Sequence, residues 1–428
     1  MIQQFKENKD KVFDENGIEL YTVRTDKFKT GSINIFFVDN LNKSNVTKNV
    51  LVSNLLKRGS NNLKSIKEIN LKLEELYGAY FECSIIKKGE WQIMQFYIDY
   101  INTTYLNKNE NIFDEILEFL FDIILNPYTK NSIFREDFFS GEKENIKRRI
   151  DSRINDKLGY SMDRCIEEMC KDEPYSIYEY GIKEDLDKLS EKDVFDYYKN
   201  YFIKQLPIKV FLSGEFDELN INKLILKLKN IKRDKIIKLN KPINSINIKK
   251  VREINEYFDV NQGKLAMGFR MDTDYFNDDY KSFVLYNSIL GGGIHSKLFT
   301  NVREKESLAY YTGSRIDKYK SLQLITSGID IDKKEKAYIL IMKQIENMKN
   351  GEISDYEYNA AIKSIETSYN YLKDTQYSLI DFYLSQVLLN NDKKIDEIVN
   401  EIKTTKKEDI KKAAQKIYLD TIYFLKSK

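Results

Sequence analysis

An order of secondary-structure elements that occurs twice limits how this chain can fold. In each half, a helix pattern ends at glycine, a short helix pattern follows, and two strand patterns come next. The first copy runs from Gly59 to Tyr77 and the second from Gly293 to Tyr310, at nearly the same spacing. A chain of 428 residues is also too long for one ordinary core. We therefore expect an internal duplication of two α+β domains, each a mainly antiparallel sheet packed against helices.

The boundary between the two halves is expected at residues 229–250. This stretch is basic, poor in helix pattern and contains Pro242, so it is predicted to link a domain at 1–228 to a domain at 251–428. Within the first half, the residues from Phe134 to about Met169 predict one long, charge-rich helix.

The charges of the chain are nearly balanced, with 69 basic and 67 acidic residues and a net charge of +2. Such a chain has no long-range attraction to nucleic acid or to an anionic membrane. The N-terminal residues lack the apolar core of a secretory signal, and no apolar run approaches the roughly 20 residues that span a bilayer. Cys83, Cys165 and Cys170 show no CxxC spacing. We expect a cytoplasmic protein with neither a nucleic-acid nor a membrane partner.

His295 is the only histidine in the chain. Because catalytic zinc sites commonly use two or three histidines, or cysteine combined with histidine, such a site within this chain is not expected. His295 follows three glycines, Gly291 to Gly293, which predict a helix end and a tight turn. A phosphate-binding loop is not expected there, because no Lys-Ser/Thr pair follows the glycines.

Two side chains shortly after the glycines could converge on one ligand. Arg303 lies in a short helix pattern with the apolar residues Phe299 and Val302, and Tyr310 lies at the start of a predicted strand. On the residues alone, an alternative remains open for each. Arg303 would be a surface side chain that pairs with Glu304 or Glu306, and Tyr310 an ordinary tyrosine of a strand.

The stretch that ends at Tyr310 resembles the C-terminal half of the M16 (pitrilysin/insulinase) metallopeptidases, whose pattern there is close to G-G-x-x-S-x-L-F-x-x-[LV]-R-E-K-x-x-L-A-Y. One extra residue stands in the glycine loop. The matching residues are Gly291, Gly292, Ser296, Leu298, Phe299, Val302, Arg303, Glu304, Lys305, Leu308, Ala309 and Tyr310. With the duplicated halves and the length, the resemblance extends to nearly the whole chain and implies two tandem M16-type (LuxS/MPP-like) domains.

The zinc site of that family, an inverted H-x-x-E-H on a helix, is degenerate here. Counting back from Gly59-Ser60 places Val50 and Asn54 at the two histidines and Ser53 at the general-base glutamate. Arg149 stands at the third ligand, in a downstream helix. Val50 has no lone pair, and Arg149 would bring a positive charge to the metal. Ser53 cannot accept a proton as a carboxylate does. The resemblance therefore implies no metal site and no peptidase activity of this chain alone.

Arg303 and Tyr310, by contrast, match an Arg–Tyr pair of the family, in which the arginine holds the substrate backbone and the tyrosine donates a hydrogen bond near the scissile carbonyl. Some bacterial members divide these parts between a chain with HxxEH and a non-catalytic chain that keeps the pair. This sequence is similar to the second kind. At the position of His295 the family has a variable residue, so we favour a loop role for this histidine.

The resemblance implies a substrate-binding or regulatory subunit of a heterodimeric zinc peptidase. A peptide would be the substrate, and an HxxEH-bearing M16 paralogue would carry the zinc. The alternative is a stand-alone peptide-binding or scaffold protein without peptidase activity. Relatives of the non-catalytic kind carry names tied to elongation factor P modification or to peptide maturation, and these residues do not choose between the two.

Overall fold

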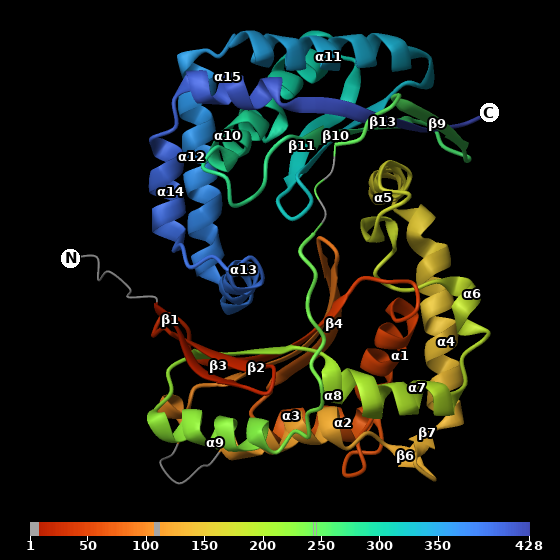
Figure 1. The fold of residues 1–428 in the computed structure, drawn as a ribbon, viewed down its shortest axis with the longest axis vertical. Coiled ribbons are helices and arrows are strands. Elements are labelled where there is room, and N and C mark those ends of the chain that lie inside the picture. The colour runs from red at the N-terminus through yellow and green to blue at the C-terminus, as the bar shows by residue number, and fades with distance from the viewer. Residues whose placement is uncertain (1–7, 107–111, 243, 245) are drawn as a thin grey trace. The chain divides into compact units, whose positions relative to one another are not determined.

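The computed structural model describes residues 8–106, 112–242, 244 and 246–428. The chain forms two compact units that do not follow the order of the sequence. Unit 1 comprises Met1–Asp151, Ile177–Asn240 and Asp374–Asn390, and unit 2 comprises Ser152–Ser176, Lys241–Lys373 and Asn391–Lys428. Each unit is of the expected α+β class, with helices packed against a sheet (Figure 1).

Unit 1 is built on a six-stranded sheet in the order β1-β2-β8-β3-β5-β4. β2 and β8 are parallel, and the other neighbours are antiparallel. β1 and β2 join through Asn16-Gly17, whose φ angles of 52° and 75° suit a two-residue hairpin turn. The strands are β1 Asn8–Glu15, β2 Ile18–Arg24, β3 Thr30–Asn40, β4 Tyr80–Lys88, β5 Trp91–Ile101 and β8 Ile208–Gly214.

Helices cover both faces of the unit 1 sheet (Figure 1). One face carries most of them, and α13 lies on the other face, although it comes from the far end of the chain. Gln376 of α13 donates to the carbonyl of Thr30 at 2.6 Å, and Asp381 pairs with Lys88 at 2.7 Å. The helices are α1 Val46–Leu56, α2 Ile66–Glu75, α3 Ile112–Leu125, α4 Glu136–Asp151, α6 Lys183–Leu186, α7 Glu191–Tyr197, α8 Ile203–Gln205, α9 Glu218–Lys229 and α13 Gln376–Leu388.

Unit 2 has a five-stranded sheet in the order β11-β12-β10-β13-β9. α5 covers one face, and α10, α11, α12, α14 and α15 lie on the other side (Figure 1). The strands are β9 Arg252–Tyr257, β10 Gly263–Met271, β11 Ala309–Asp317, β12 Leu322–Ile329 and β13 Ile417–Lys426. The helices are α5 Lys157–Met169, α10 Tyr280–Gly291, α11 Lys334–Asn350, α12 Asp355–Tyr371, α14 Ile395–Lys403 and α15 Lys407–Gln415.

The prediction of a single helix from Phe134 to Met169 is wrong. α4 ends at Asp151, and a 3-10 turn over Ser152–Asn155 separates it from α5. Asp156 caps α5, because its carboxylate accepts a hydrogen bond from the amide of Gly159 at 3.0 Å. This break lies at a boundary between the two units, because α4 belongs to unit 1 and α5 to unit 2.

Buried charges anchor the α5 segment to the sheet of unit 2. Glu173, four residues beyond α5, accepts from Arg270 at 2.6 Å and from Lys320 at 2.7 Å. Arg270 also pairs with Asp420 at 2.8 Å. The side chain of Lys320 is 0% exposed and that of Arg270 is 7% exposed, so these ion pairs lie in the interior of the unit.

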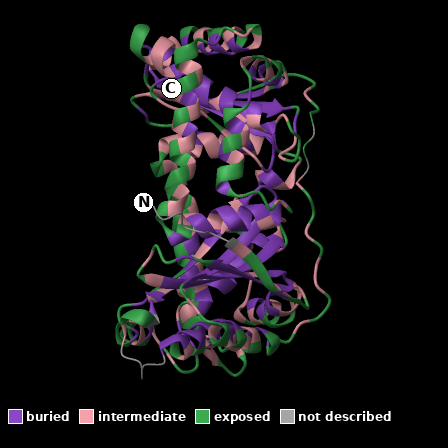
Figure 2. Cartoon of the chain, turned by 90° about the vertical axis from the view of Figure 1, so that its left-hand side faces the viewer, coloured by how far each residue is buried: buried purple, intermediate pink, exposed green. Residues whose placement is uncertain are grey.

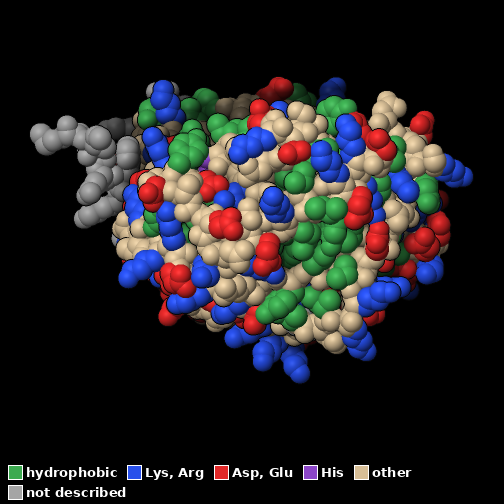
Figure 3. Space-filling view, turned by 90° about the horizontal axis from the view of Figure 1, so that it is seen from above, with side chains coloured by type: hydrophobic (Ala, Val, Ile, Leu, Met, Phe, Trp, Pro, Cys, Tyr) green, Lys and Arg blue, Asp and Glu red, His purple; other side chains and the backbone are tan. Residues whose placement is uncertain are grey.

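The core of each unit lies along its sheet, where strands are mainly buried, whereas the outer surfaces of the helices are exposed (Figure 2). The described residues between α9 and β9 form no helix or strand. None of the helices in the described ranges has the length and apolar character that crossing a bilayer demands. The face seen in Figure 3 mixes basic and acidic side chains, in agreement with the balanced composition.

Candidate functional site

The three α1 residues that the resemblance places at the zinc site are poor metal ligands. Val50 and Ser53 are 1% and 0% exposed, and Asn54 is half-buried. The hydroxyl of Ser53 donates to the carbonyl of Asn49 at 2.8 Å, one turn earlier in the same helix. The hydroxyl proton of Ser53 is therefore already engaged with the helix backbone.

The fourth position, Arg149, lies on α4, which packs beside α1 (Figure 1). Its guanidinium lies 3.6 Å from the centre of the Tyr180 ring, in a cation–π contact. On the same helix, the buried Glu142 pairs with Arg58 at 3.2 Å, just beyond the end of α1. The structure thus brings the α1 and α4 positions to one helix pair, where Arg149 supplies a guanidinium and Arg58 is paired with Glu142.

A buried hydrogen-bond network that the sequence reasoning missed lies beside these positions. The carboxylate of Asp39 accepts from Asn49 and Tyr201 at 3.0 Å and from Asn45 at 3.2 Å. Asn49 also donates to Gln92 at 2.9 Å. Burial raises the pKa of Asp39 above its ordinary value, although the hydrogen bonds from these neutral donors act in the opposite direction. The polar groups next to Val50 are therefore satisfied by the protein itself.

Over the described ranges, no three His, Cys, Asp or Glu side chains are grouped in a way that could hold a metal ion. The chemistry of the four positions agrees, because an alkyl group, a hydroxyl, an amide and a guanidinium replace the ligand set of a zinc site. None of these four side chains carries a carboxylate or an imidazole that could act as a general base.

Arg303 lies in unit 2 on η5, a π-helix over Leu298–Lys305. Stretches of π-helix are rare and are often found at functional sites. Its guanidinium lies over the Phe299 ring at 4.7 Å, and its Nε is 3.8 Å from the carboxylate of Glu304. The Arg303 side chain is 40% exposed, so this long ion pair is weak and leaves hydrogen-bond donors free for a ligand.

Tyr310 lies in edge strand β11, at a β-bulge that interrupts the pairing with β12 between Ala309 and Tyr311. Bulges re-aim side chains and are frequent beside functional sites. The Tyr310 ring is 57% exposed, and its hydroxyl donates to Asp330 at 3.1 Å. This hydrogen bond and the charge of Asp330 raise the pKa of Tyr310, so that its phenol stays protonated at neutral pH.

The neighbouring Tyr311 has a different environment. It is half-buried, and a Cβ added to Gly328 would lie 2.3 Å from its ring, so the ring packs flat on that glycine. Of the two adjacent tyrosines, Tyr310 is the one that faces solvent. Although η5 and β11 pack together, the structure gives no hydrogen bond between Arg303 and Tyr310, both of which it describes.

The glycine turn before η5 has a packing role, and His295 lies within it. A Cβ added to Gly291 would lie 2.5 Å from the backbone nitrogen of Ser314, so only glycine allows α10 to end this close to β11. His295 is 9% exposed, with its Nε2 3.5 Å from the Ser288 hydroxyl, and burial lowers its pKa. This environment agrees with the loop role favoured for His295.

Comparison with known proteins identifies the class. Residues 188–365 match the family model described as the peptidase M16 inactive domain. The chain is 32% identical over 412 residues to YmfF of Bacillus subtilis (strain 168), described as a probable inactive metalloprotease, with 96% of each chain covered. It therefore belongs to the M16 peptidase family. Within that family it is an inactive peptidase homologue.

Two further relatives extend this comparison. The crystal structure of a conserved protein from Enterococcus faecalis V583 matches with a TM-score of 0.90 and 27% identity, over 98% of this chain and 99% of that one. YmxG of Bacillus subtilis (strain 168), described as an uncharacterized zinc protease, is 24% identical over 162 residues, which are 37% of this chain and 39% of YmxG. The first match shows that a solved structure shares this fold over 98% of the chain.

Proposed function

We propose that this chain is the substrate-binding subunit of a heterodimeric zinc peptidase, whose second subunit is an M16 paralogue that carries HxxEH. The observation that carries the proposal is an asymmetry between the two units. Unit 1 carries Val50, Asn54 and Arg149 at the positions where the resemblance places the zinc ligands, whereas unit 2 presents Arg303 and Tyr310 with exposed polar ends. Absence of metal ligands together with retention of the exposed pair fits a chain that binds a substrate cleaved at the metal of another subunit.

In this proposal the two side chains have separate tasks. The guanidinium of Arg303 binds carbonyl oxygens of an extended peptide through its fork of donors. The phenol of Tyr310 turns from Asp330 and donates a hydrogen bond to the carbonyl oxygen on which negative charge develops. An exposed side chain makes such a rotation within nanoseconds, so the existing bond to Asp330 is no barrier.

The sheet of unit 2 supports binding of an extended peptide. β11 is an edge strand whose sheet neighbour among the described strands is β12 alone. A peptide that adds to its free side would pair with main-chain groups between Ala309 and Asp317 and would pass Tyr310. We further propose that the zinc resides in the paralogue and that the complex is cytoplasmic. The three buried cysteines are all free, which fits a reducing compartment.

Two substitutions in the mixed complex test the proposal. Arg303→Ala removes a charge-assisted contact worth about 1.5–3 kcal/mol, so kcat/KM for a peptide should fall roughly 10- to 150-fold. Tyr310→Phe removes one transition-state donor and should lower kcat by about 100-fold or more. Both variants should still form the complex.

The chain offers a matched control for each variant. Lys305→Ala changes a cation of the same helix that bonds to Asn301 at 3.0 Å, and Tyr311→Phe changes the adjacent tyrosine. Both controls should retain activity. Full activity of the Arg303 and Tyr310 variants would remove these residues from the site. If the chain forms no complex with an HxxEH paralogue yet binds peptides, it is instead a stand-alone peptide-binding protein.

A further inference from the structure

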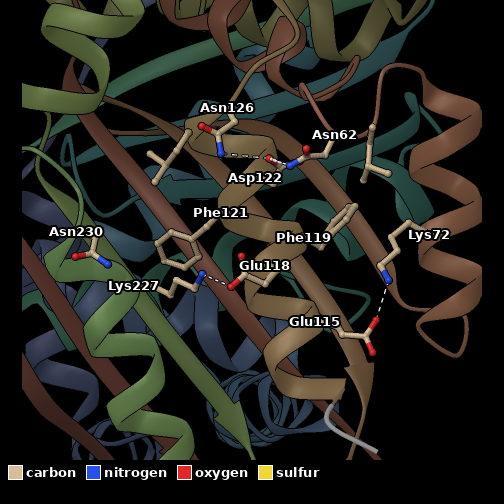
Figure 4. A pocket seen from close by; sticks show the side chains of 12 residues that line it. Asn62, Lys72, Glu115, Glu118, Phe119, Phe121, Asp122, Asn126, Lys227 and Asn230 are labelled. Atoms are coloured by element: carbon tan, nitrogen blue, oxygen red, sulfur yellow. Dashed lines mark hydrogen bonds and ion pairs between the residues drawn. The ribbon is translucent and has the colours of Figure 1, made fainter.

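One pocket lies in unit 1 and another in unit 2, and they differ in whether the charged side chains that line them are paired. The pocket in unit 1 has a volume of about 430 Å³ and lies between α2, α3 and α9, with Phe119 in its wall (Figure 4). At its rim, Lys72 pairs with Glu115 at 2.7 Å, and Lys227 pairs with Glu118. These four charges pair with one another, and Asp122, which also lines the pocket, accepts hydrogen bonds from Asn62 and Asn126, so the lining offers a ligand no unpaired cation.

The pocket in unit 2 has a volume of about 230 Å³ and lies on the sheet face that α5 covers. Its apolar walls are Ile166 of α5 and Leu322 and Leu324 of β12. Edge strand β11 contributes Arg315 and Asp317, which stand directly opposite Leu324 and Leu322 in the register of the hairpin. The pocket therefore borders the same strand that carries Tyr310.

The two charged residues of this pocket are in different states. The carboxylate of Asp317 accepts three hydrogen bonds, from the hydroxyl of Tyr175 at 2.6 Å and from the amides of Tyr319 at 2.8 Å and Lys320 at 3.0 Å. Arg315 is exposed and makes no hydrogen bond or ion pair with any residue that the structure describes. The pocket thus combines a satisfied anion, an apolar wall and an available cation.

The size of the pocket limits its ligand. A volume of 230 Å³ corresponds to about eight water molecules at about 30 Å³ each, and it is below the roughly 300–1,000 Å³ of most small-molecule sites. An apolar amino-acid residue of leucine size has about as many non-hydrogen atoms as this number of water molecules, so one such residue suits the pocket. Because the pocket lies beside the available guanidinium of Arg315, we expect its ligand to carry a carboxylate, which arginine binds through two parallel hydrogen bonds.

We propose that this pocket binds the C-terminal residue of a peptide, with its apolar side chain against Ile166, Leu322 and Leu324 and its terminal carboxylate on Arg315. The only residue of a peptide that carries both an apolar side chain and a carboxylate is the last one. The inference rests on the proposed function in that it takes a peptide as the ligand. It deepens that function by naming the end of the peptide that is recognised.

Peptide binding to the full chain alone, measured by fluorescence anisotropy, tests the inference. Two labelled peptides of one sequence would end in leucine, one as the free acid and one as the amide, and a third would end in glycine acid. The leucine acid should bind about tenfold or more tightly than either of the others. Arg315→Gln should abolish the difference between acid and amide.

The matched control is Lys336→Gln, which removes a cation of the same unit that pairs with Glu306 at 3.2 Å and lies outside the pocket. This variant should keep the difference between acid and amide. Equal binding of the two wild-type ligands, no binding at about 1 mM, or a difference that survives in Arg315→Gln would each overturn the assignment.

The outcome is separable from that of the proposed function, because no paralogue is present in the binding assay. If the chain forms an active complex that is sensitive to Arg303→Ala but does not distinguish acid from amide, only the pocket assignment is wrong. If the chain prefers the peptide with the free acid but forms no complex, only the proposed role as a peptidase subunit is wrong.

Discussion

Replacing Glu173 with glutamine should destabilise unit 2 by about 3 kcal/mol. The carboxylate receives hydrogen bonds from Arg270 at 2.6 Å and from Lys320 at 2.7 Å, and all three side chains are largely buried. Breaking a buried ion pair by removing one partner costs about 3–5 kcal/mol. Glutamine keeps one acceptor oxygen, so we expect the lower end of this range. That loss corresponds to roughly a hundredfold change in the equilibrium constant for opening.

Hydrogen exchange measured by mass spectrometry is the suitable assay, because it reports each unit separately. The only tryptophan, Trp91, lies in β5 of unit 1, so its fluorescence does not monitor the sheet that Glu173 anchors. Amides of β10 and β12 should lose protection in Glu173→Gln. The control Glu401→Gln affects a half-exposed pair with Lys393 at 2.7 Å and should cost less than about 1 kcal/mol. Equal losses in the two variants would refute the reasoning.

The same carboxylate predicts a pH dependence. Burial acts to raise the pKa of Glu173, but the hydrogen bonds from Arg270 and Lys320 outweigh it and hold the pKa below its ordinary value. Because the folded pKa is below the unfolded value of about 4.3, this stabilisation is complete above that value. It is lost as the pH falls through the folded pKa. Glu173→Gln should therefore weaken the acid sensitivity of unit 2.

Three further predictions concern isolated positions. Burial lowers the pKa of His295, so the NMR titration of this single histidine should have its midpoint below about 6.5; a midpoint above 6.5 contradicts the loop environment. The contribution of neutral His295 to the free energy of unfolding should be lost as the pH falls through the folded pKa of this histidine. Burial also raises the pKa of Cys83 to about 12, and Cys165 and Cys170 are buried too. All three thiols should therefore react with a disulfide reagent only after denaturation, and rapid reaction of the native chain would disprove this. Gly351→Ala should cost about 1–2 kcal/mol in urea unfolding, because the residue ends α11 at a φ of 80°, and an unchanged midpoint would count against that strain.

The elements whose signals lie within one segment could be predicted from the sequence. The two strand pairs, β4 with β5 and β11 with β12, follow from local alternation and from the duplicated order of elements. The β1–β2 hairpin was not predicted, although Asn16-Gly17 is a strong hairpin signal, because β1 is rich in charged residues. Here the information was present in the sequence.

The assignment of α5 to unit 2 could not be predicted from local patterns. It depends on contacts between distant positions, such as Arg164 with Glu256 at 3.1 Å and Arg270 with Glu173 at 2.6 Å. Helix periodicity continues across the boundary with α4 and contains no information about which sheet the helix covers. The capping carboxylate of Asp156 was the one local sign of a break.

The sequence nominated candidate residues for the site, but it gave no information about their geometry. A motif identified Arg303 and Tyr310, but the π-helix and the β-bulge that carry them depend on packing against neighbouring elements. The network around Asp39 was missed because its partners, including Gln92 and Tyr201, come from separate strands and helices. Arg315 gave no signal either, since only the fold shows that it lacks a partner beside an apolar pocket.

The central claim is that this chain contributes to peptide hydrolysis without a metal of its own. The direct test compares zinc content and peptide hydrolysis for this chain, for its HxxEH paralogue and for an equimolar mixture of the two. We predict stoichiometric zinc in the paralogue only, and hydrolysis by the mixture that falls when Arg303 is replaced by alanine. Stoichiometric zinc together with peptide hydrolysis in this chain alone would contradict the account.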